Sequence, residues 1–141
     1  MSKDLIEGEE TRGDPVSRTI ELDQFIGRSP DAVWRALTEP ELLARWWAQG
    51  DIKPVVGHRF TLDMGSWGLQ PCEVLEVEPG RLLKYSFAEG ALDTTITWRL
   101  VPEGDGTRLF LEHAGFTDER AFRGMGGGWP GILAKLASTA V

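Results

Sequence analysis

The segment TTITWRLVPEGDGTRLFLEH, residues 94–113, constrains the fold of this chain more than any other stretch. Apolar and polar residues alternate on both sides of EGDG, which is the pattern of two strands that each bury one face. Glycine next to aspartate favours the tight turn of a hairpin. The side chains predicted to share the buried face are Ile96, Trp98, Leu100, Leu109, Leu111 and His113. Such a hairpin needs another layer to cover its apolar face.

Three further stretches predict antiparallel strands. In HRFTLDM, residues 58–64, apolar side chains again occupy every second position, and CEVLEVEPGRLLKYSF predicts two strands joined by a turn at Pro79 and Gly80. A strand is also predicted within residues 16–26, with its alternation broken near Gln24. Together with the hairpin, these stretches predict a sheet of six antiparallel strands, which twists and curls so that one face is concave.

Two short helices are predicted between the first and second strands. Ser29 is a good N-cap, and Pro30 follows it at the first helical position, where the missing N–H costs nothing. The second helix repeats the arrangement, with Thr38 or Glu39 as its cap and Pro40 at its first position. Two helices joined this tightly form a bent helical unit.

The end of the chain returns to a helical period. Thr117 is the predicted N-cap, and the stripe that begins at Phe122 is interrupted by GMGGG, residues 124–128. GGGWPG at 126–131 has the glycine spacing of a dinucleotide-binding loop, but only ten residues follow Gly131, so the required strand–helix–strand unit is missing. The glycines therefore predict a hinge or break before a final helix that Pro130 begins.

Trp46 and Trp47 stand side by side in LLARWW, residues 42–47, in a chain that has six tryptophans. Adjacent helical residues point about 100° apart, so a helix cannot bury both against one flat surface. We therefore expect one ring to pack on the sheet or on the C-terminal helix, while its neighbour lines or caps the mouth of an internal cavity.

Charge and composition exclude several classes of function. The formal net charge of −7 and the pI of about 4.8 argue against nucleic acid and against an anionic membrane surface as partners. The single Cys72 excludes an internal disulfide and fits a reducing compartment. No signal sequence or apolar span is present, so we predict a cytoplasmic bacterial protein. Residues 1–16 are predicted to form a flexible acidic tail, and residues 17–141 a single domain.

Several motifs, in this order, resemble those of a known superfamily. They are SPDAVWRALTEPELLARWW, GHRFTLDM, EVEPGRLLKYSF, TITWRL followed after five residues by GTRLFLEHAGF, and GGW-x3-L-x2-L. The pattern covers roughly residues 17–138 and resembles the START-like superfamily, also called SRPBCC proteins. Within it, the chain is similar to the activator of heat-shock-chaperone ATPase homologue group. The resemblance implies an α+β helix-grip fold, in which a curved six-stranded antiparallel sheet wraps around a long C-terminal helix, with two short helices after the first strand.

The resemblance also implies a site, because members of the superfamily bind apolar ligands between the curved sheet and the C-terminal helix. The positions that this places around the cavity are Trp46, Trp47, Phe60, Met64, Tyr85, Phe87, Trp98, Leu109, His113, Trp129 and Leu133. Aromatic, Met and Leu side chains with few polar groups are typical of a pocket for apolar molecules. Tyr85, His113 and either Asp63 or Arg99 are the groups expected to orient a ligand.

We expect a non-catalytic protein that binds a small hydrophobic or amphipathic molecule, without cofactor or metal and as a monomer or homodimer. His58 and His113 are the only histidines, and neither has ligands at the spacing of a zinc site. His113 is read either as a core histidine with one hydrogen bond or as a polar group of the pocket.

Two alternatives remain. The first is a co-chaperone-like domain that binds a chaperone and stimulates its ATPase in the stress response. The resemblance weighs against it, because the eukaryotic co-chaperones carry an additional N-terminal domain where this chain has an acidic tail. The second is an enzyme of the polyketide cyclase or dehydratase type, with His113 or Tyr85 as acid or base. The scarcity of converging ionisable residues weighs against that enzyme.

Overall fold

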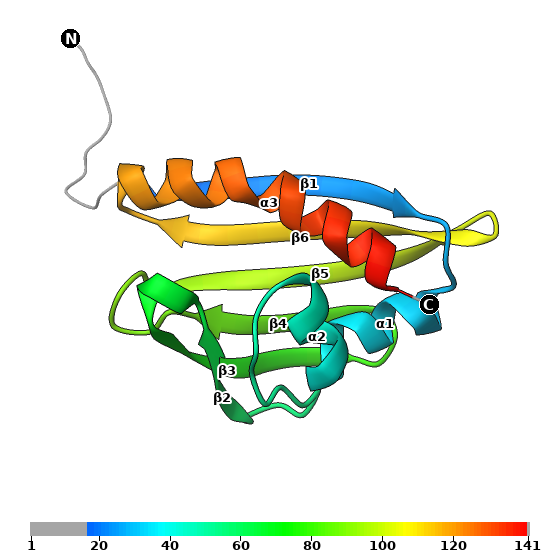
Figure 1. The fold of residues 1–141 in the computed structure, drawn as a ribbon, viewed down its shortest axis with the longest axis horizontal. Coiled ribbons are helices and arrows are strands. Elements are labelled where there is room, and N and C mark those ends of the chain that lie inside the picture. Colours follow the sequence, from blue (N-terminus) through cyan, green and yellow to red (C-terminus); the bar gives the residue numbers. More distant parts are fainter. Residues whose placement is uncertain (1–16, 141) are drawn as a thin grey trace, which may run out of the picture.

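The computed structural model describes residues 17–140, so the predicted acidic tail of residues 1–16 lies outside the described residues. One antiparallel sheet has the strand order β1-β6-β5-β4-β3-β2. The strands are β1 (Arg18–Ile26), β2 (Arg59–Asp63), β3 (Leu69–Glu78), β4 (Leu82–Phe87), β5 (Thr94–Glu103) and β6 (Gly106–Phe116). The helices are α1 (Pro30–Thr38), α2 (Pro40–Trp46), the 3-10 turn η1 (Gly65–Trp67) and α3 (Glu119–Thr139). The predicted α+β helix-grip fold is confirmed (Figure 1).

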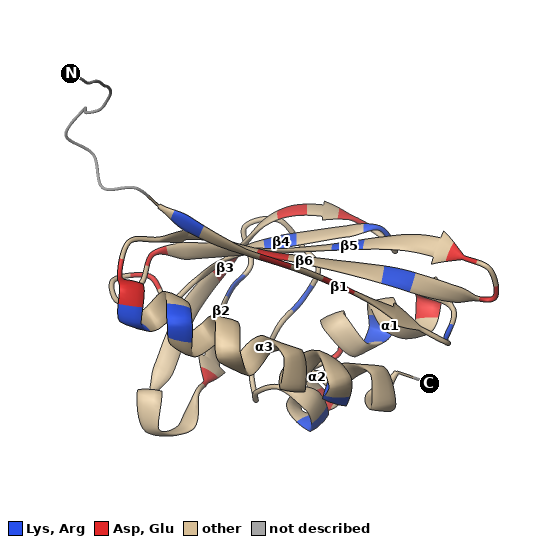
Figure 2. Ribbon diagram, turned by 90° about the horizontal axis from the view of Figure 1, so that it is seen from above, with Lys and Arg blue, Asp and Glu red and all other residues tan. Residues whose placement is uncertain are grey.

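The helices cover one face of the sheet. Figure 2 shows α1, α2 and α3 on the same side of the strands, so the sheet has an inner face toward the helices and an outer face toward solvent. The long helix α3 packs against β1 and β6 and also against α2, whereas α1 packs against β5 and β6. The core therefore lies between the inner face and the three helices. Among residues 17–140, no helix is both long and apolar enough to cross a membrane.

The predicted hairpin is confirmed, and the side chains predicted to face inwards do so. In the pairing of β5 with β6, Trp98 lies opposite Leu111 and Ile96 lies opposite His113, and all four side chains are buried on the inner face. The turn between β3 and β4 is also confirmed at the predicted place, where Gly80 has a φ of +77° that a residue with a side chain rarely adopts. The hydrophobic pattern thus fixes which side chains face the helices.

Strand β1 corrects one expectation, since its alternation is not broken near Gln24. Ile20 and Ile26 are buried, and Gln24 continues the same parity between them, opposite Leu109 of β6. Phe25 points to the outer face and is 45% exposed. A polar residue at an inward position and an aromatic residue at an outward one produced the apparent break.

The two short helices begin as predicted. The Ser29 hydroxyl accepts a hydrogen bond from the Ala32 N–H at 3.2 Å, and Pro30 begins α1. Pro40 begins α2 after Glu39, whose side chain makes no capping hydrogen bond. Because proline has no N–H, Pro40 cannot provide the helical donor four residues beyond the Ala36 carbonyl. The indole Nε1–H of Trp46 donates to that carbonyl instead, at 2.8 Å, and so satisfies the end of α1.

The start of α3 differs from the prediction by one residue. The N-cap is Asp118 rather than Thr117, and its carboxylate accepts from the backbone N–H groups of Arg120 at 2.9 Å and Ala121 at 3.3 Å. A carboxylate at this position also interacts favourably with the positive end of the helix dipole.

The predicted break in the C-terminal helix is wrong. Helix α3 continues through GMGGG and contains Pro130 in its interior. Pro130 leaves the Gly126 carbonyl without its helical donor, so a change of direction rather than a break is expected there. Figure 1 shows such a change midway along α3. Burial of Trp129 and Leu133 on the sheet side holds the helix together against the low helix propensity of its glycines.

Candidate functional site

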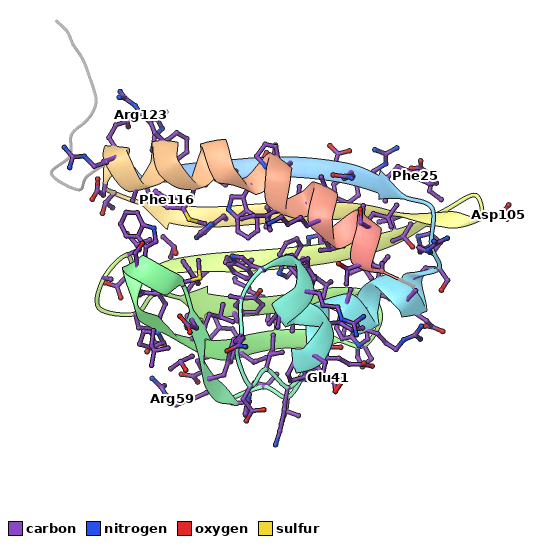
Figure 3. All side chains as sticks on the ribbon, in the orientation of Figure 1. Phe25, Glu41, Arg59, Asp105, Phe116 and Arg123 are labelled. Atoms are coloured by element: carbon purple, nitrogen blue, oxygen red, sulfur yellow. The ribbon has the colours of Figure 1, made fainter. Side chains whose placement is uncertain are left out.

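The side chains proposed to surround a cavity lie on the inner face of the sheet and on the helices that cover it. Nine of the eleven are buried: Trp46, Phe60, Tyr85, Phe87, Trp98, Leu109, His113, Trp129 and Leu133. The other two, Trp47 and Met64, are partly buried against the same core. Figure 3 shows Phe116 of β6 pointing to the interior, in contrast to Arg59, Asp105 and Arg123, which point outwards.

Six ring-bearing side chains meet between the sheet and the helices, and we call them the aromatic cluster: Trp46, Trp47, Phe87, Trp98, His113 and Trp129. The ring of Trp47 lies 5.1 Å from that of Trp129 on α3 and 5.7 Å from that of Phe87 on β4. The ring of Trp98 on β5 meets those of Trp46 and Trp129 edge-on, each at 5.7 Å. The cluster therefore joins α2, three strands and α3.

Both members of the Trp46–Trp47 pair point into the interior because the helix ends between them. Helix α2 stops at Trp46, and the backbone of Trp47 has a φ of −137° and a ψ of −78°, outside the helical region. The 100° separation of helical neighbours therefore does not apply, and the two rings stack with their centroids 5.8 Å apart. Trp46 packs toward the sheet and α1, while Trp47 packs on α3, so both rings are held by packing, and a role of Trp47 at the mouth of a cavity stays a prediction.

The segment after Trp47 is fixed to the edge strand β2. The Asp63 N–H donates to the Gln49 carbonyl at 2.8 Å. Gly50 lies so close to β2 that a Cβ added there would be 2.5 Å from the Thr61 carbonyl oxygen, a distance that no side chain tolerates. These contacts hold the Trp47 ring over the inner face.

His113 lies in a chain of hydrogen bonds in which the donor and acceptor of each bond can be assigned. The Trp129 Nε1–H donates to Nδ1 of His113 at 3.0 Å. Because an indole nitrogen only donates, Nδ1 is the acceptor and the ring hydrogen sits on Nε2. Nε2 then donates to the Thr94 hydroxyl at 2.9 Å, and that hydroxyl donates to the Phe87 carbonyl at 3.1 Å. Each of these polar side-chain atoms has a partner.

Burial keeps this histidine neutral. Desolvation lowers the pKa of His113 from its ordinary value of 6.5 to about 3. Protonation of Nδ1 would also place two N–H groups, those of His113 and Trp129, against each other. His113 is therefore poorly suited to act as an acid or base near neutral pH.

The second polar pair of the inner face is Trp98 with Tyr85. The Trp98 Nε1–H donates to the Tyr85 hydroxyl oxygen at 2.9 Å, and burial raises the pKa of that phenol further above its ordinary value of 10. Within residues 17–140, the hydroxyl hydrogen of Tyr85 has no acceptor. Nearby, burial raises the pKa of the Cys72 thiol to about 12, so the thiolate needed for nucleophilic chemistry is absent near neutral pH.

The indole nitrogen of Trp47 is the one buried side-chain nitrogen or oxygen in the described part of the chain that has no hydrogen-bond partner. The indole nitrogens of the two adjacent tryptophans differ in this respect. Trp46 Nε1–H donates to the Ala36 carbonyl, and Trp129 Nε1–H donates to Nδ1 of His113. Buried donors are nearly always paired, so an unpaired one requires an explanation.

Two of the suggested orienting groups lie away from the cluster. Arg99 is exposed on the outer face, where it is paired with Leu82 and Phe110 on the neighbouring strands. Asp63 is exposed at the end of β2, and its carboxylate accepts a hydrogen bond from the Gly65 N–H at 3.0 Å. Among the described residues, no group of three His, Cys, Asp or Glu side chains is arranged to hold a metal ion.

Sequence reasoning missed Thr94 and Phe116. Thr94 has the inward parity of Ile96 and Trp98, so its place beside His113 could have been read from the alternation. The inward position of Phe116 could not be read from the alternation, because the β1–β6 register shifts beside it and Gly115 has a φ of +96°. This irregularity turns Phe116 inwards, with its ring 4.4 Å from that of His113.

Comparison with protein families gives one match that covers most of the chain. The family described as activator of Hsp90 ATPase homolog 1-like protein matches residues 28–140. The chain therefore belongs to this family. A comparison with curated proteins found no match.

Solved structures support the same placement. Protein MLL2253 from Mesorhizobium loti is 38% identical, with a TM-score of 0.81 over 86% of this chain and 96% of its own. CalU16 from Micromonospora echinospora is 35% identical, with a TM-score of 0.75 over 88% of this chain and 76% of its own. The Aha1 dimer from Colwellia psychrerythraea is 19% identical and shares the fold, with a TM-score of 0.78 over 87% of this chain and 96% of that protein.

Proposed function

We propose that this chain binds a small hydrophobic or amphipathic molecule, without covalent chemistry, between the inner face of the sheet and α3. The observation that carries the proposal is the aromatic cluster, in which rings from α2, β4, β5, β6 and α3 converge. Ligand sites for apolar molecules combine such surfaces with a few polar groups. The proposed lining is the full set of inner residues: Trp46, Trp47, Phe60, Met64, Tyr85, Phe87, Trp98, Leu109, His113, Trp129 and Leu133.

We propose that two members of this lining form the entrance. Trp47 and Met64 are partly exposed, whereas the other members are buried. Met64 precedes η1, and its unbranched thioether adapts to ligands of different shape. A molecule that enters beside these two side chains reaches the rings of Phe87 and Trp129 next.

An enzymatic role for the same site has less support. His113 has both ring nitrogens in hydrogen bonds and a lowered pKa, and the Tyr85 phenol has a raised one. A general acid or base works best with a pKa near the pH of the reaction. Binding rather than proton transfer is what these groups favour.

The test is native mass spectrometry of the purified protein before and after incubation with a lipid and metabolite extract. We expect a discrete added mass that is lost on denaturation. A fluorescence titration with the uncharged probe N-phenyl-1-naphthylamine follows, on Phe87→Leu and on Phe110→Leu. Phe87 lies in the cluster, whereas Phe110 lies on the outer face and is 40% exposed. Phe87→Leu should weaken probe binding and Phe110→Leu should not; no binding to the wild type would refute the proposal.

A second candidate function is the binding of another protein, and one observation favours it. Trp67 on η1 is 80% exposed and Leu69 at the start of β3 is 66% exposed, which is unusual for large apolar side chains that are close in sequence. The family description and the dimeric Colwellia relative accord with a chaperone or a second copy as the partner. The test compares the ATPase rate of a heat-shock chaperone with wild type and with Trp67→Ala. An unchanged rate with the wild type would exclude the chaperone as the partner, and a monomeric mass in analytical ultracentrifugation would exclude a second copy.

A further inference from the structure

We infer that Trp47 is the polar anchor of the proposed ligand site, and that its Nε1–H donates a hydrogen bond to an acceptor oxygen of an uncharged, mainly apolar ligand. The inference rests on the proposed function and specifies the chemistry of the molecule that the site takes.

The four tryptophans of the aromatic cluster differ in one respect. Three of their indole N–H groups have acceptors within the chain, namely Trp46 with the Ala36 carbonyl, Trp98 with the Tyr85 hydroxyl and Trp129 with Nδ1 of His113. The fourth, on Trp47, is equally removed from solvent and has none among residues 17–140. A buried donor that has lost its water and gained no partner is destabilising, so an acceptor from outside the chain is expected.

The position of Trp47 agrees with this role. Its ring bridges α3 and β4 through Trp129 and Phe87, which is where the proposed ligand lies. The side chain is also partly exposed, in contrast to the fully buried Trp46. The ring therefore lies at the proposed entrance with its N–H removed from solvent, and the close contact of Gly50 with β2 fixes the segment that follows it.

The buried interior of the described residues offers no cation to a charged ligand group. Besides Tyr85, Cys72 and the tryptophans, its polar side chains are Thr38, Thr94, Thr97, Thr107 and His113, and it contains no Lys or Arg. A carboxylate or phosphate would lose its water here without gaining a cation. A ketone, ether or hydroxyl oxygen accepts from an indole N–H at a much smaller desolvation cost. The ligand is therefore an apolar molecule with a neutral oxygen acceptor.

The test uses two probes of the same shape. In 2-acetylnaphthalene a carbonyl oxygen accepts hydrogen bonds, and in 2-isopropenylnaphthalene a CH2 group replaces that oxygen. Dissociation constants for both are measured by calorimetry on wild type, Trp47→Phe and Trp34→Phe. Trp34 is a partly buried residue of α1 outside the cluster. The ratio of the two constants should change by about threefold to tenfold in favour of the alkene in Trp47→Phe, the size of one neutral hydrogen bond, and should stay at the wild-type value in Trp34→Phe.

A second measurement guards against a folding defect in the phenylalanine variant. Replacing Trp47 by its benzothienyl analogue puts sulfur in place of the N–H and keeps the ring size, and it should change the ratio in the same way. In the wild type, the indole hydrogen of Trp47 should shift downfield in nuclear magnetic resonance spectra with the ketone but not with the alkene.

The outcomes separate the two proposals. If both probes bind and their ratio is the same in wild type and in both Trp47 variants, the anchor is wrong and the ligand site stands. Tighter binding of 2-naphthoate than of 2-acetylnaphthalene would overturn the uncharged ligand. If neither probe binds the wild type, the ligand site itself fails, and the anchor fails with it.

Discussion

The two ends of the aromatic cluster use polar groups in opposite ways. At the His113 end, the indole of Trp129, the imidazole, the Thr94 hydroxyl and a backbone carbonyl form a closed chain of hydrogen bonds. At the Trp47 end, an indole of the same kind is buried and its N–H has no partner in the described part of the chain. The rings of Trp129 and Trp47 are only 5.1 Å apart, so the contrast arises within one packed unit.

This contrast distinguishes polar groups that support the fold from those that are available to a ligand. A closed network specifies one arrangement of its members, and breaking it leaves buried groups unpaired. An open donor costs stability and becomes useful only when an acceptor arrives. We therefore expect substitutions at the His113 end to affect folding, and those at the Trp47 end to affect binding.

The largest expected effect comes from Trp129→Ala, because Trp129 belongs to both ends. The substitution removes a fully buried ring and the donor to His113, and it should lower the free energy of unfolding by about 3–5 kcal/mol. Urea denaturation followed by circular dichroism measures the change. Trp67→Ala is the control, since an 80% exposed side chain should contribute within about 0.5 kcal/mol. Equal losses in the two variants would show that the cluster is not the centre of the core.

The next effect is a pH dependence that His113 introduces. The pKa of His113 is lowered to about 3 in the folded chain from its ordinary 6.5, so between these values the unfolded chain binds a proton that the folded chain does not. The free energy of unfolding should therefore fall as the pH falls from about 6.5 toward 3, by at most about 1.4 kcal/mol per pH unit. Urea denaturation between pH 7 and pH 4.5 measures the slope for wild type and His113→Gln. The wild type should lose about 2 kcal/mol more than the variant over this range, and parallel curves would contradict the neutral, buried histidine.

The threonine pair at the start of β5 gives a smaller effect. Thr94→Val removes the acceptor of the His113 Nε2–H and should cost about 1–2 kcal/mol. Thr95→Val is a matched control on the opposite face of the same strand, and it should change the free energy of unfolding by less than about 0.5 kcal/mol. Thermal melts of both variants measure the difference. If Thr94→Val were as stable as Thr95→Val, the hydrogen-bonded chain would not contribute to the fold.

Much of the fold could be predicted because its signals are local. Period-two alternation set the strands of the hairpin, and Pro30 and Pro40 set the starts of two helices. The wrong predictions came where packing opposes local propensity. Trp129 and Leu133 keep α3 continuous across its glycines, and Gln24 occupies an inward position in β1.

The candidate site could be predicted only in part. Parity indicated which aromatic side chains face inwards, but it cannot show which polar atoms find partners. The acceptor of Trp46 is a carbonyl left free by Pro40, and that of Trp129 is a histidine 16 positions away on another element. The Trp47 N–H has no acceptor among residues 17–140, and the direction of its ring follows from a non-helical backbone that the neighbouring sequence does not specify.

The smallest expected effect on stability is that of Trp47→Phe. Its comparison with Trp46→Phe tests most directly the contrast between an indole with no partner in the described part of the chain and a paired one. Trp46→Phe removes the donor to Ala36, which Pro40 cannot replace, and should cost about 2–3 kcal/mol when packing loss is included. Trp47→Phe loses some packing but also removes a buried donor that has no partner among residues 17–140, so the free energy of unfolding should change by less than about 1 kcal/mol. Urea denaturation of both variants decides the point. Equal costs would mean that the Trp47 N–H is already satisfied in solution, and a site that needs an outside acceptor would then have no basis.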